Sequence, residues 1–132
     1  VAWELPADGF AAIRTLWAAG ESGDLTLLVA VRPLGASSHE EEVIGAARIL
    51  PGAEPYGYIE PLLSTEYDGA GLHTRATLEL WAGEDEPQPQ RGAGGRVAGA
   101  ASDSPLGRFE AARFAWRLEG RAAIGAYEIL TP

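Results

Sequence analysis

The chain has 132 residues, of which 19 are acidic and 10 are basic, so its formal net charge is −9. Every basic residue is Arg, and no basic stripe interrupts the acidic excess, so the composition disfavours binding to nucleic acids and to anionic membrane surfaces. The absence of Cys excludes disulfides, thiolate nucleophiles and Cys-ligated metal sites.

A chain of this length can bury one proper core, so we expect residues 1–132 to form a single domain. No apolar run approaches the roughly 20 residues that span a bilayer, and the N-terminus lacks the pattern of a signal peptide. Together with the lack of Cys, these features predict a cytoplasmic protein that does not bind membranes.

The first two segments of the chain carry different periodicities. Residues Asp8–Ala19 have apolar side chains at 10, 13, 16 and 17, an N-cap candidate at the start and Gly20 after the end, which predicts a short helix. Residues Asp24–Arg32 are rich in β-branched and apolar side chains and lie between Gly23 and Pro33, which predicts a strand.

The segment Ser38–Leu50 fits two structures. Ser38 and Glu41 form a capping box, and a Pro-Gly pair follows the segment, which is the pattern of a helix. The stretch Val43–Leu50 can also form a strand, followed by a turn and a second strand. The family resemblance described below favours the strand.

The clearest hairpin joins Tyr56–Tyr67 to Leu72–Trp81 through a Gly-containing turn. Setting the last residue of the first strand opposite the first residue of the second keeps apolar residues opposite apolar ones on one face. On the other face this register sets Glu66 opposite His73. Pro61 indicates an edge strand or a bulge.

The second half of the chain predicts another hairpin. Residues Gly83–Gln90 are polar and Pro-rich, as in an exposed loop, and a weak strand is expected around Gly95–Gly99 with a turn at Ser102–Pro105. The hairpin joins Gly107–Leu118 to Ala122–Leu130. Its alternation places Phe114, Trp116, Tyr127 and Ile129 on one face, and Arg113, Arg117 and Glu128 on the other.

From Glu42 onward the sequence runs EVIGAARILPGAEPYGYIEPLLSTEYDGAGLHTRATLELW, followed later by GRVAG and by FAWRLEGRAAIGAYEIL. The order of strands and turns in these segments resembles the C-terminal half of the AttH-like, lipocalin-like proteins, a group that includes the carotenoid 1,2-hydratase (hydroxyneurosporene synthase) type. The resemblance covers about two-thirds of the chain, and its motifs are turns and packing positions.

The resemblance implies an all-β, antiparallel, lipocalin-like fold, either a half barrel or an eight-stranded barrel. Members of the family enclose an apolar cavity between two barrel-like halves, and their assigned activities are water addition, cyclisation or isomerisation of hydrophobic substrates. Because this chain has the size of one half, the resemblance also implies a partner, which is expected to be a second copy, a companion half-barrel chain or a missing piece of the protein itself.

Two groups of residues are candidates for acid–base chemistry. A carboxylate beside an imidazole orients it and raises its basicity, which makes His73 a candidate acid/base and Glu66 its orienting partner. The alternative is an exposed ion pair near the hairpin turn. Glu128 is a candidate second acid inside the cavity, and the alternative is a pair with Arg113 across the hairpin.

A hydrophobic ligand would be bound by aromatic walls. The candidate ligand-binding residues are Tyr58, Trp81, Phe114, Trp116 and Tyr127. No metal-ligand spacing is present, so neither a metal nor another cofactor is expected. The first hypothesis is a small cofactor-independent hydratase, cyclase or isomerase, and the alternatives are a non-catalytic binder of a hydrophobic small molecule or a structural half-domain that completes the cavity of a partner.

Overall fold

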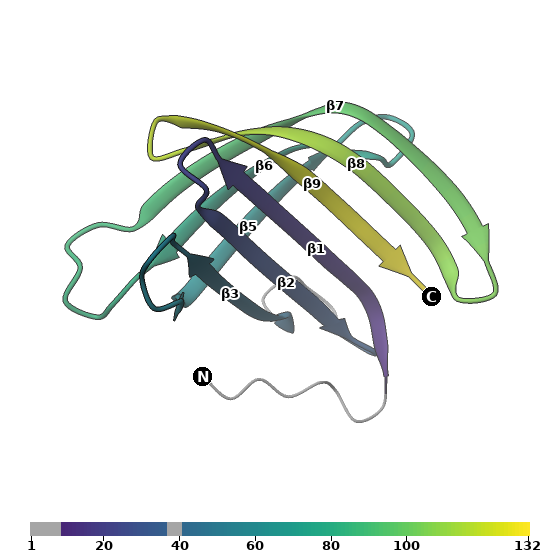
Figure 1. The fold of residues 1–132 in the computed structure, drawn as a ribbon. Helices are drawn as coiled ribbons and strands as arrows, with labels where there is room; N and C mark the ends of the chain where they lie inside the picture. The colour runs from purple at the N-terminus through teal and green to yellow at the C-terminus, as the bar shows by residue number, and fades with distance from the viewer. Residues whose placement is uncertain (1–8, 37–40) are drawn as a thin grey trace.

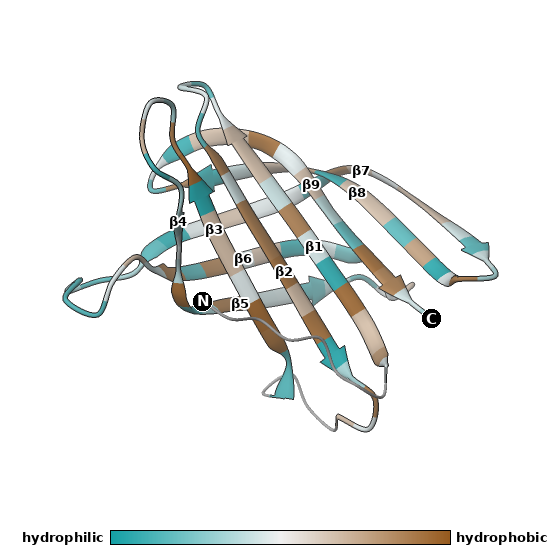
Figure 2. Ribbon diagram, turned by 60° about the horizontal axis from the view of Figure 1, so that its bottom comes forward, coloured by the Kyte–Doolittle hydropathy of each residue, from teal (hydrophilic) through white to brown (hydrophobic). Residues whose placement is uncertain are grey.

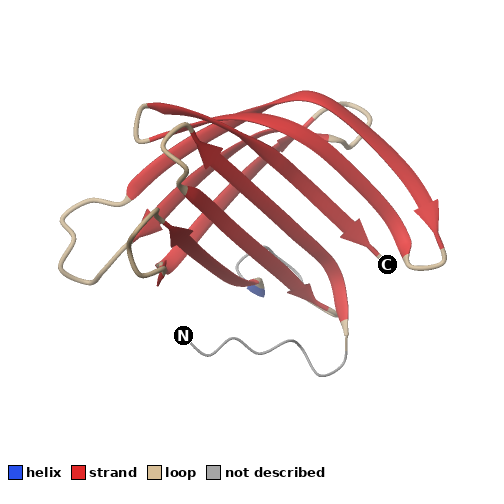
Figure 3. Ribbon diagram, viewed as in Figure 1, coloured by secondary structure: helices blue, strands red, loops and turns tan. Residues whose placement is uncertain are grey.

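The computed structural model describes residues 9–36 and 41–132. These residues form strands and loops, apart from a single 3₁₀ position at Glu41 (Figure 3). The strands are β1 (Phe10–Gly20), β2 (Leu25–Pro33), β3 (Val43–Ile49), β4 (Tyr56–Gly57), β5 (Ile59–Tyr67), β6 (His73–Trp81), β7 (Gln90–Ser104), β8 (Gly107–Leu118) and β9 (Arg121–Thr131).

All strands belong to one antiparallel sheet in the order β4-β3-β2-β1-β9-β8-β7-β6-β5. The sheet curls into a nearly closed barrel (Figure 1), which confirms the predicted antiparallel, lipocalin-like fold. The two ends of the sheet are consecutive in the chain, because β4 pairs with β3 and β5 pairs with β6. Glu60, the second residue of β5, has a φ of 47°. Pro61 follows it in the irregular part of β5, in agreement with the predicted edge position or bulge.

The predicted helix at Asp8–Ala19 is wrong, because strand β1 occupies these positions and the N-cap candidate lies outside the described residues. Arg14, Leu16 and Ala18 are buried, whereas Trp17 between them is 40% exposed. This alternation has the period of a strand. The helix-like spacing arose because apolar residues occur on both faces of β1.

For the second ambiguous segment the strand alternative is correct. Val43–Ile49 forms β3 and pairs with β2 along its whole length. The capping-box residue Ser38 lies outside the described residues. Barrel closure therefore decides the structure of a segment whose local pattern is also compatible with a helix.

The first hairpin forms, but the predicted register is wrong. Glu66 pairs with Arg75 rather than with His73. The turn explains the shift, because the Asp68 carboxylate accepts hydrogen bonds at 2.9 and 3.0 Å from the backbone N–H groups of Ala70 and Leu72. Leu72 is therefore part of the turn, and Tyr67 pairs with His73, which shifts the register by one residue. An irregularity between Glu66 and Tyr67 shifts it by one more, so that Glu66 pairs with Arg75.

The second hairpin confirms its predicted alternation. Phe114 and Trp116 face the barrel interior together with Tyr127, while Arg113 and Glu128 face outward. Strand β7 is longer than expected, because its 15 residues extend to Ser104, and of the predicted turn at Ser102–Pro105 only Pro105 lies in the turn. The Pro-rich stretch after β6 is a loop up to residue 89.

The barrel centre is packed with side chains. The ring of Phe114 lies 5.1 Å from that of Trp116 and 5.5 Å from that of Tyr127. Gly94 leaves room for the large indole, since an added Cβ there would overlap Trp116. The buried hydrophobic cluster consists of Leu16, Ala18, Leu28, Ala30, Tyr58, Ala76, Leu78, Leu80, Ala112, Phe114, Trp116, Leu118, Ala123, Tyr127 and Ile129.

Strand β9 approaches β1 most closely at Gly125, where an added Cβ would overlap the backbone carbonyl of Trp17. We expect Gly125→Ala to lower the free energy of unfolding in urea by about 3 kcal/mol, because a backbone clash inside a sheet is relieved only by moving a strand. Gly69→Ala is the control, since nothing lies within 4 Å of its added Cβ, and it should change stability by less than about 0.5 kcal/mol. Equal stability of the two variants would contradict the close approach.

Candidate functional site

A buried polar cluster lies where β1, β5 and β9 approach the start of β3. Arg14 is its centre: Nη2 donates a hydrogen bond at 2.8 Å to Oε2 of Glu42, and the two side chains are 4% and 1% exposed. The other nitrogen, Nη1, donates to Thr65 Oγ1 at 3.1 Å and to the Tyr127 hydroxyl at 3.2 Å. We call Arg14, Glu42, Thr65 and Tyr127 the Arg14 cluster.

The Tyr127 hydroxyl is held on two sides. It lies 2.6 Å from Thr65 Oγ1, in addition to its contact with Arg14. Burial raises the pKa of Tyr127 above its ordinary value, although the Arg14 charge and the Thr65 hydrogen bond oppose the shift. The phenol is therefore neutral at neutral pH and acts as a hydrogen-bonding group within the cluster.

His73 lies next to this cluster and is buried at 2% exposure. Its Nε2–H donates a hydrogen bond at 2.7 Å to the backbone carbonyl of Tyr127, and its ring is 4.6 Å from the Tyr127 ring. The other nitrogen, Nδ1, lies 3.8 Å from Glu110 Oε2 and has no hydrogen-bond partner within the described residues. Glu110 is also bound by Arg108 at 3.0 Å.

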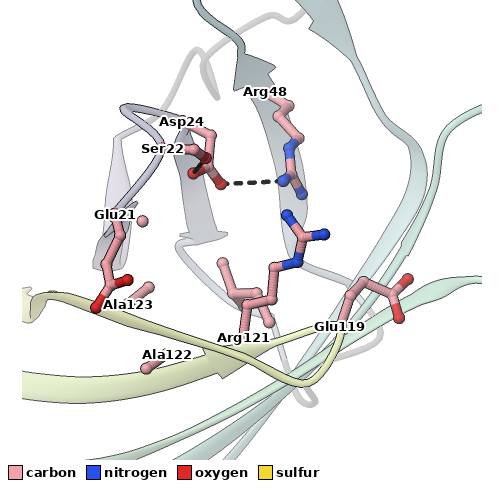
Figure 4. Close-up of a pocket in the computed structure, with 10 residues that line it drawn as sticks. Glu21, Ser22, Asp24, Arg48, Glu119, Arg121, Ala122 and Ala123 are labelled. Atoms are coloured by element: carbon pink, nitrogen blue, oxygen red, sulfur yellow. Dashed lines mark hydrogen bonds and ion pairs between the residues drawn. The ribbon is translucent and has the colours of Figure 1, made fainter.

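A pocket of about 610 Å³ opens at the end of the barrel where the β1–β2 and β8–β9 turns meet β3 (Figure 4). We call it the mouth pocket. Its lining residues are Gly20, Glu21, Ser22, Asp24, Arg48, Leu118, Glu119, Arg121, Ala122 and Ala123.

One wall of the mouth pocket is a tied carboxylate. Ser22 Oγ donates to Asp24 Oδ1 at 2.7 Å, and Arg48 Nη2 donates to Asp24 Oδ2 at 3.0 Å. The Ser22 hydrogen bond, supported by the charges of Arg48 and Arg121, holds the pKa of Asp24 below its usual value. Asp24 is therefore ionised at neutral pH and fixes the direction of Arg48.

The opposite wall presents a second cation, Arg121, whose charge also acts on Asp24. Arg121 follows the two-residue turn in which Glu119 and Gly120 both have positive φ. Its guanidinium points into the mouth pocket toward that of Arg48 (Figure 4). Within residues 9–36 and 41–132 it has no ion pair or hydrogen bond, so two cationic groups converge on open space.

Below the mouth pocket a second polar layer closes the barrel. The Tyr58 hydroxyl donates to Gln90 Oε1 at 2.6 Å, and Arg48 Nη1 lies 3.4 Å from the same oxygen. Burial raises the pKa of Tyr58 to about 12. A small cavity of about 10 Å³ here is also lined by Thr26, whose buried hydroxyl has no hydrogen-bond partner within the described residues.

The structure separates the predicted catalytic residues. Glu66 is 75% exposed on its side chain and lies 3.9 Å from Arg75, on the opposite face of the sheet from His73. Glu128 lies on the outer face instead of inside the cavity, where Thr15 Oγ1 is 3.5 Å from its carboxylate. The catalytic roles of these residues remain predictions.

The predicted ligand-binding aromatics also divide. Phe114, Trp116 and Tyr127 pack together in the core, and Tyr58 belongs to the layer below the mouth pocket. Trp81 is half-buried at the end of β6. None of the five lines the mouth pocket itself.

Sequence reasoning missed the charged residues that point inward. Arg14 alternates with Leu16 and Ala18 on the buried face of β1, and Arg48 occupies the corresponding face of β3. A charge on the apolar face of a strand was the available signal. It was hidden because the first segment has a helix-like spacing and the second was left open between a helix and a strand.

Replacing Glu42 by Gln should lower the free energy of unfolding by about 3 kcal/mol, because the Arg14 guanidinium would stay buried without its counterion. Urea denaturation checks this change. Glu66→Gln is the matched control, since its carboxylate is 75% exposed and its loss should change stability by less than about 0.5 kcal/mol. A small effect at both positions would show that the Arg14–Glu42 pair does not stabilise the barrel.

The raised pKa of Tyr58 predicts a late step in an alkaline titration. A tyrosine pKa raised in the folded state contributes stability that is present below the unfolded value of about 10 and is lost as the pH rises through about 12. At about pH 11, which is below the pKa of Tyr58 in the folded protein, Tyr58 should remain largely protonated. Phenolate absorbance measures its ionisation, and circular dichroism shows whether the protein is still folded at that pH. Tyr58→Phe should remove a late step from the alkaline titration of phenolate absorbance. If the variant instead loses a step near pH 10, the raised pKa of Tyr58 is contradicted.

Within the described residues there is no helix long and apolar enough to cross a membrane, and no group of three or more His, Asp or Glu residues could hold a metal ion. In comparisons with known proteins, no family model and no curated protein matches the chain. The resemblance to the AttH-like proteins therefore remains a prediction, and the function has to be argued from the geometry of the site.

Proposed function

We propose that the protein binds a small monocarboxylate with a short apolar body in the mouth pocket. The observation that carries the proposal is the convergence of Arg48 and Arg121 on the same open volume (Figure 4). Two guanidinium groups that face each other repel, and a carboxylate between them would replace the repulsion by charge-assisted hydrogen bonds.

The floor of the mouth pocket suits the rest of such a ligand. Leu118, Ala122 and Ala123 contribute apolar surface beneath the two guanidinium groups. Apolar walls with a few placed polar groups are typical of small-molecule sites. The position of the ligand differs from the sequence-based hypothesis, which placed it among the core aromatics.

The acidic lining residues favour one negative charge on the ligand over two. Glu21 and Glu119 belong to the pocket lining in addition to the tied Asp24. Their carboxylates would repel a dianion more strongly than a monoanion. Phosphate and dicarboxylates should therefore bind more weakly than a monocarboxylate of similar size.

The second candidate is the acid–base enzyme that the sequence suggested, a hydratase, cyclase or isomerase. The observation in its favour is His73, whose Nδ1 lies beside Glu110 without a hydrogen-bond partner within the described residues. Its ring is 2% exposed and packs against Phe114 and Tyr127, so a substrate would have to displace core side chains to reach it. The mouth pocket needs no such movement, and binding there is the function we favour.

Isothermal titration calorimetry with hexanoate tests the proposal. Arg121→Gln should weaken binding about 10-fold or more, because one charge-assisted interaction with the carboxylate is lost. Arg75→Gln is the control, since this exposed arginine lies on the outer face of β6. Hexanamide, which has the same apolar body without the charge, should bind more weakly than hexanoate.

Two results would contradict the proposal. One is equal affinity for hexanoate and hexanamide, which would show that the converging guanidinium groups do not recognise charge. The other is unchanged hexanoate affinity in Arg121→Gln. A His73→Gln variant that keeps hexanoate binding would separate the mouth pocket from the buried imidazole.

A further inference from the structure

The outer face of the barrel carries an apolar surface across β3, β2, β1 and β9. Register sets Trp17 beside Leu27 on one side and beside Ala126 on the other. The next row brings Ile49, Leu25, Ala19 and Ile124 together. The exposed fractions of the large side chains are 40% for Trp17, 37% for Leu27, 39% for Ile49 and 70% for Ile124. Figure 2 shows apolar residues along the neighbouring strands β2, β1 and β9.

A groove of about 510 Å³ adjoins this surface, with Trp17 and Ile124 forming a ridge along it. We call it the outer groove. Its complete lining is Trp17, Ala98, Gly99, Ala100, Ala111, Ala112, Arg113, Ile124, Gly125, Ala126 and Glu128. Small residues form the floor, so a ridge of large side chains from another surface can fit against it.

Two charges of opposite sign line the outer groove. Within the described residues, Arg113 has no ion pair or hydrogen bond, and the one polar contact of the Glu128 carboxylate is with Thr15 Oγ1 at 3.5 Å. They do not pair with each other in the structure, although they lie on adjacent rows of the same face. Each is therefore available to a surface that presents the opposite charge at the matching position.

We propose that a second copy of the chain covers this face in a symmetric dimer. The two-fold axis lies parallel to the sheet and passes between Arg113 and Glu128. It sets Arg113 of each copy opposite Glu128 of the other copy. The same axis passes near Trp17 and brings the two Trp17 side chains together, because Trp17 is about equally far from Arg113, two strands away in the same row, and from Glu128, one strand and one row away. An interface of this kind is self-complementary and closed, so it produces a dimer rather than a filament.

The charge distribution favours a second copy over an unrelated partner. The outer groove contains one Arg and one Glu, so the two copies would contribute two balanced pairs at the interface. Like charges facing each other across an interface cost affinity, whereas complementary pairs fix the register. The net charge of −9 opposes association, but charges farther apart than the ~8 Å Debye length at physiological salt are largely screened.

Analytical ultracentrifugation of the whole chain provides the first test. The wild-type protein should sediment with twice the 13.9 kDa mass of one chain, and Ile124→Glu should sediment as a folded monomer by circular dichroism. Arg75→Glu, which changes an exposed charge on β6, should leave the dimer unchanged. A wild-type monomer at high micromolar concentration would overturn the proposal.

A charge-exchange experiment tests the proposed symmetry. Arg113→Glu alone creates two Glu–Glu pairs across the axis, and Glu128→Arg alone creates two Arg–Arg pairs, so each variant should dimerise at least about 10-fold more weakly than the wild type. An equimolar mixture restores two complementary pairs and should form heterodimers. Because rescue occurs only between different chains, a contact within one chain cannot explain it. Two folded variants that stay monomeric after mixing would overturn the assigned axis.

Discussion

Closure of one sheet by one short stretch of chain is the constraint on which the rest of the structure depends. Tyr56 and Gly57 pair with β3, and the strand that begins two residues later pairs with β6 at the other edge of the sheet. Once the two edges meet, each strand has an inward and an outward face, and inward polar groups need partners. The Arg14 cluster lies where β3 and β5 are not joined by backbone hydrogen bonds, and its side chains connect β1 and β9 to β5 there.

Alternation predicted the second hairpin well, because β8 and β9 have one clearly apolar face. The Phe114 and Trp116 positions specify which side of β8 is buried, and Tyr127 follows once the turn is placed at Glu119. The first hairpin failed by a small shift, since Asp68 binds two backbone N–H groups and keeps Leu72 in the turn. The residue types in this segment fit this turn and a turn one residue shorter equally well.

The candidate site could not be predicted for a different reason. Asp24 precedes β2, Arg48 belongs to β3 and Arg121 begins β9; these segments meet only when the barrel closes, and no sequence spacing relates them. His73 was predicted to be an acid/base oriented by Glu66, but in the structure its partners are the Tyr127 carbonyl and the core rings. Local pairing can suggest which residues bear chemistry, whereas the long-range arrangement of the sheet decides which of them meet.

Strand β9 contributes residues to the mouth pocket, the Arg14 cluster and the outer groove, because its side chains alternate between the two faces of the sheet. Its first residue, Arg121, supplies the second guanidinium of the mouth pocket, and Tyr127 reaches inward to the Arg14 cluster. Ile124 and Glu128 point outward to the outer groove. A one-residue slip of β9 would exchange its two faces and remove all three features together. Gly125 restricts such a slip, because only a residue without a side chain fits against the Trp17 carbonyl. This contact between β9 and β1 therefore also fixes the position of both proposed binding surfaces.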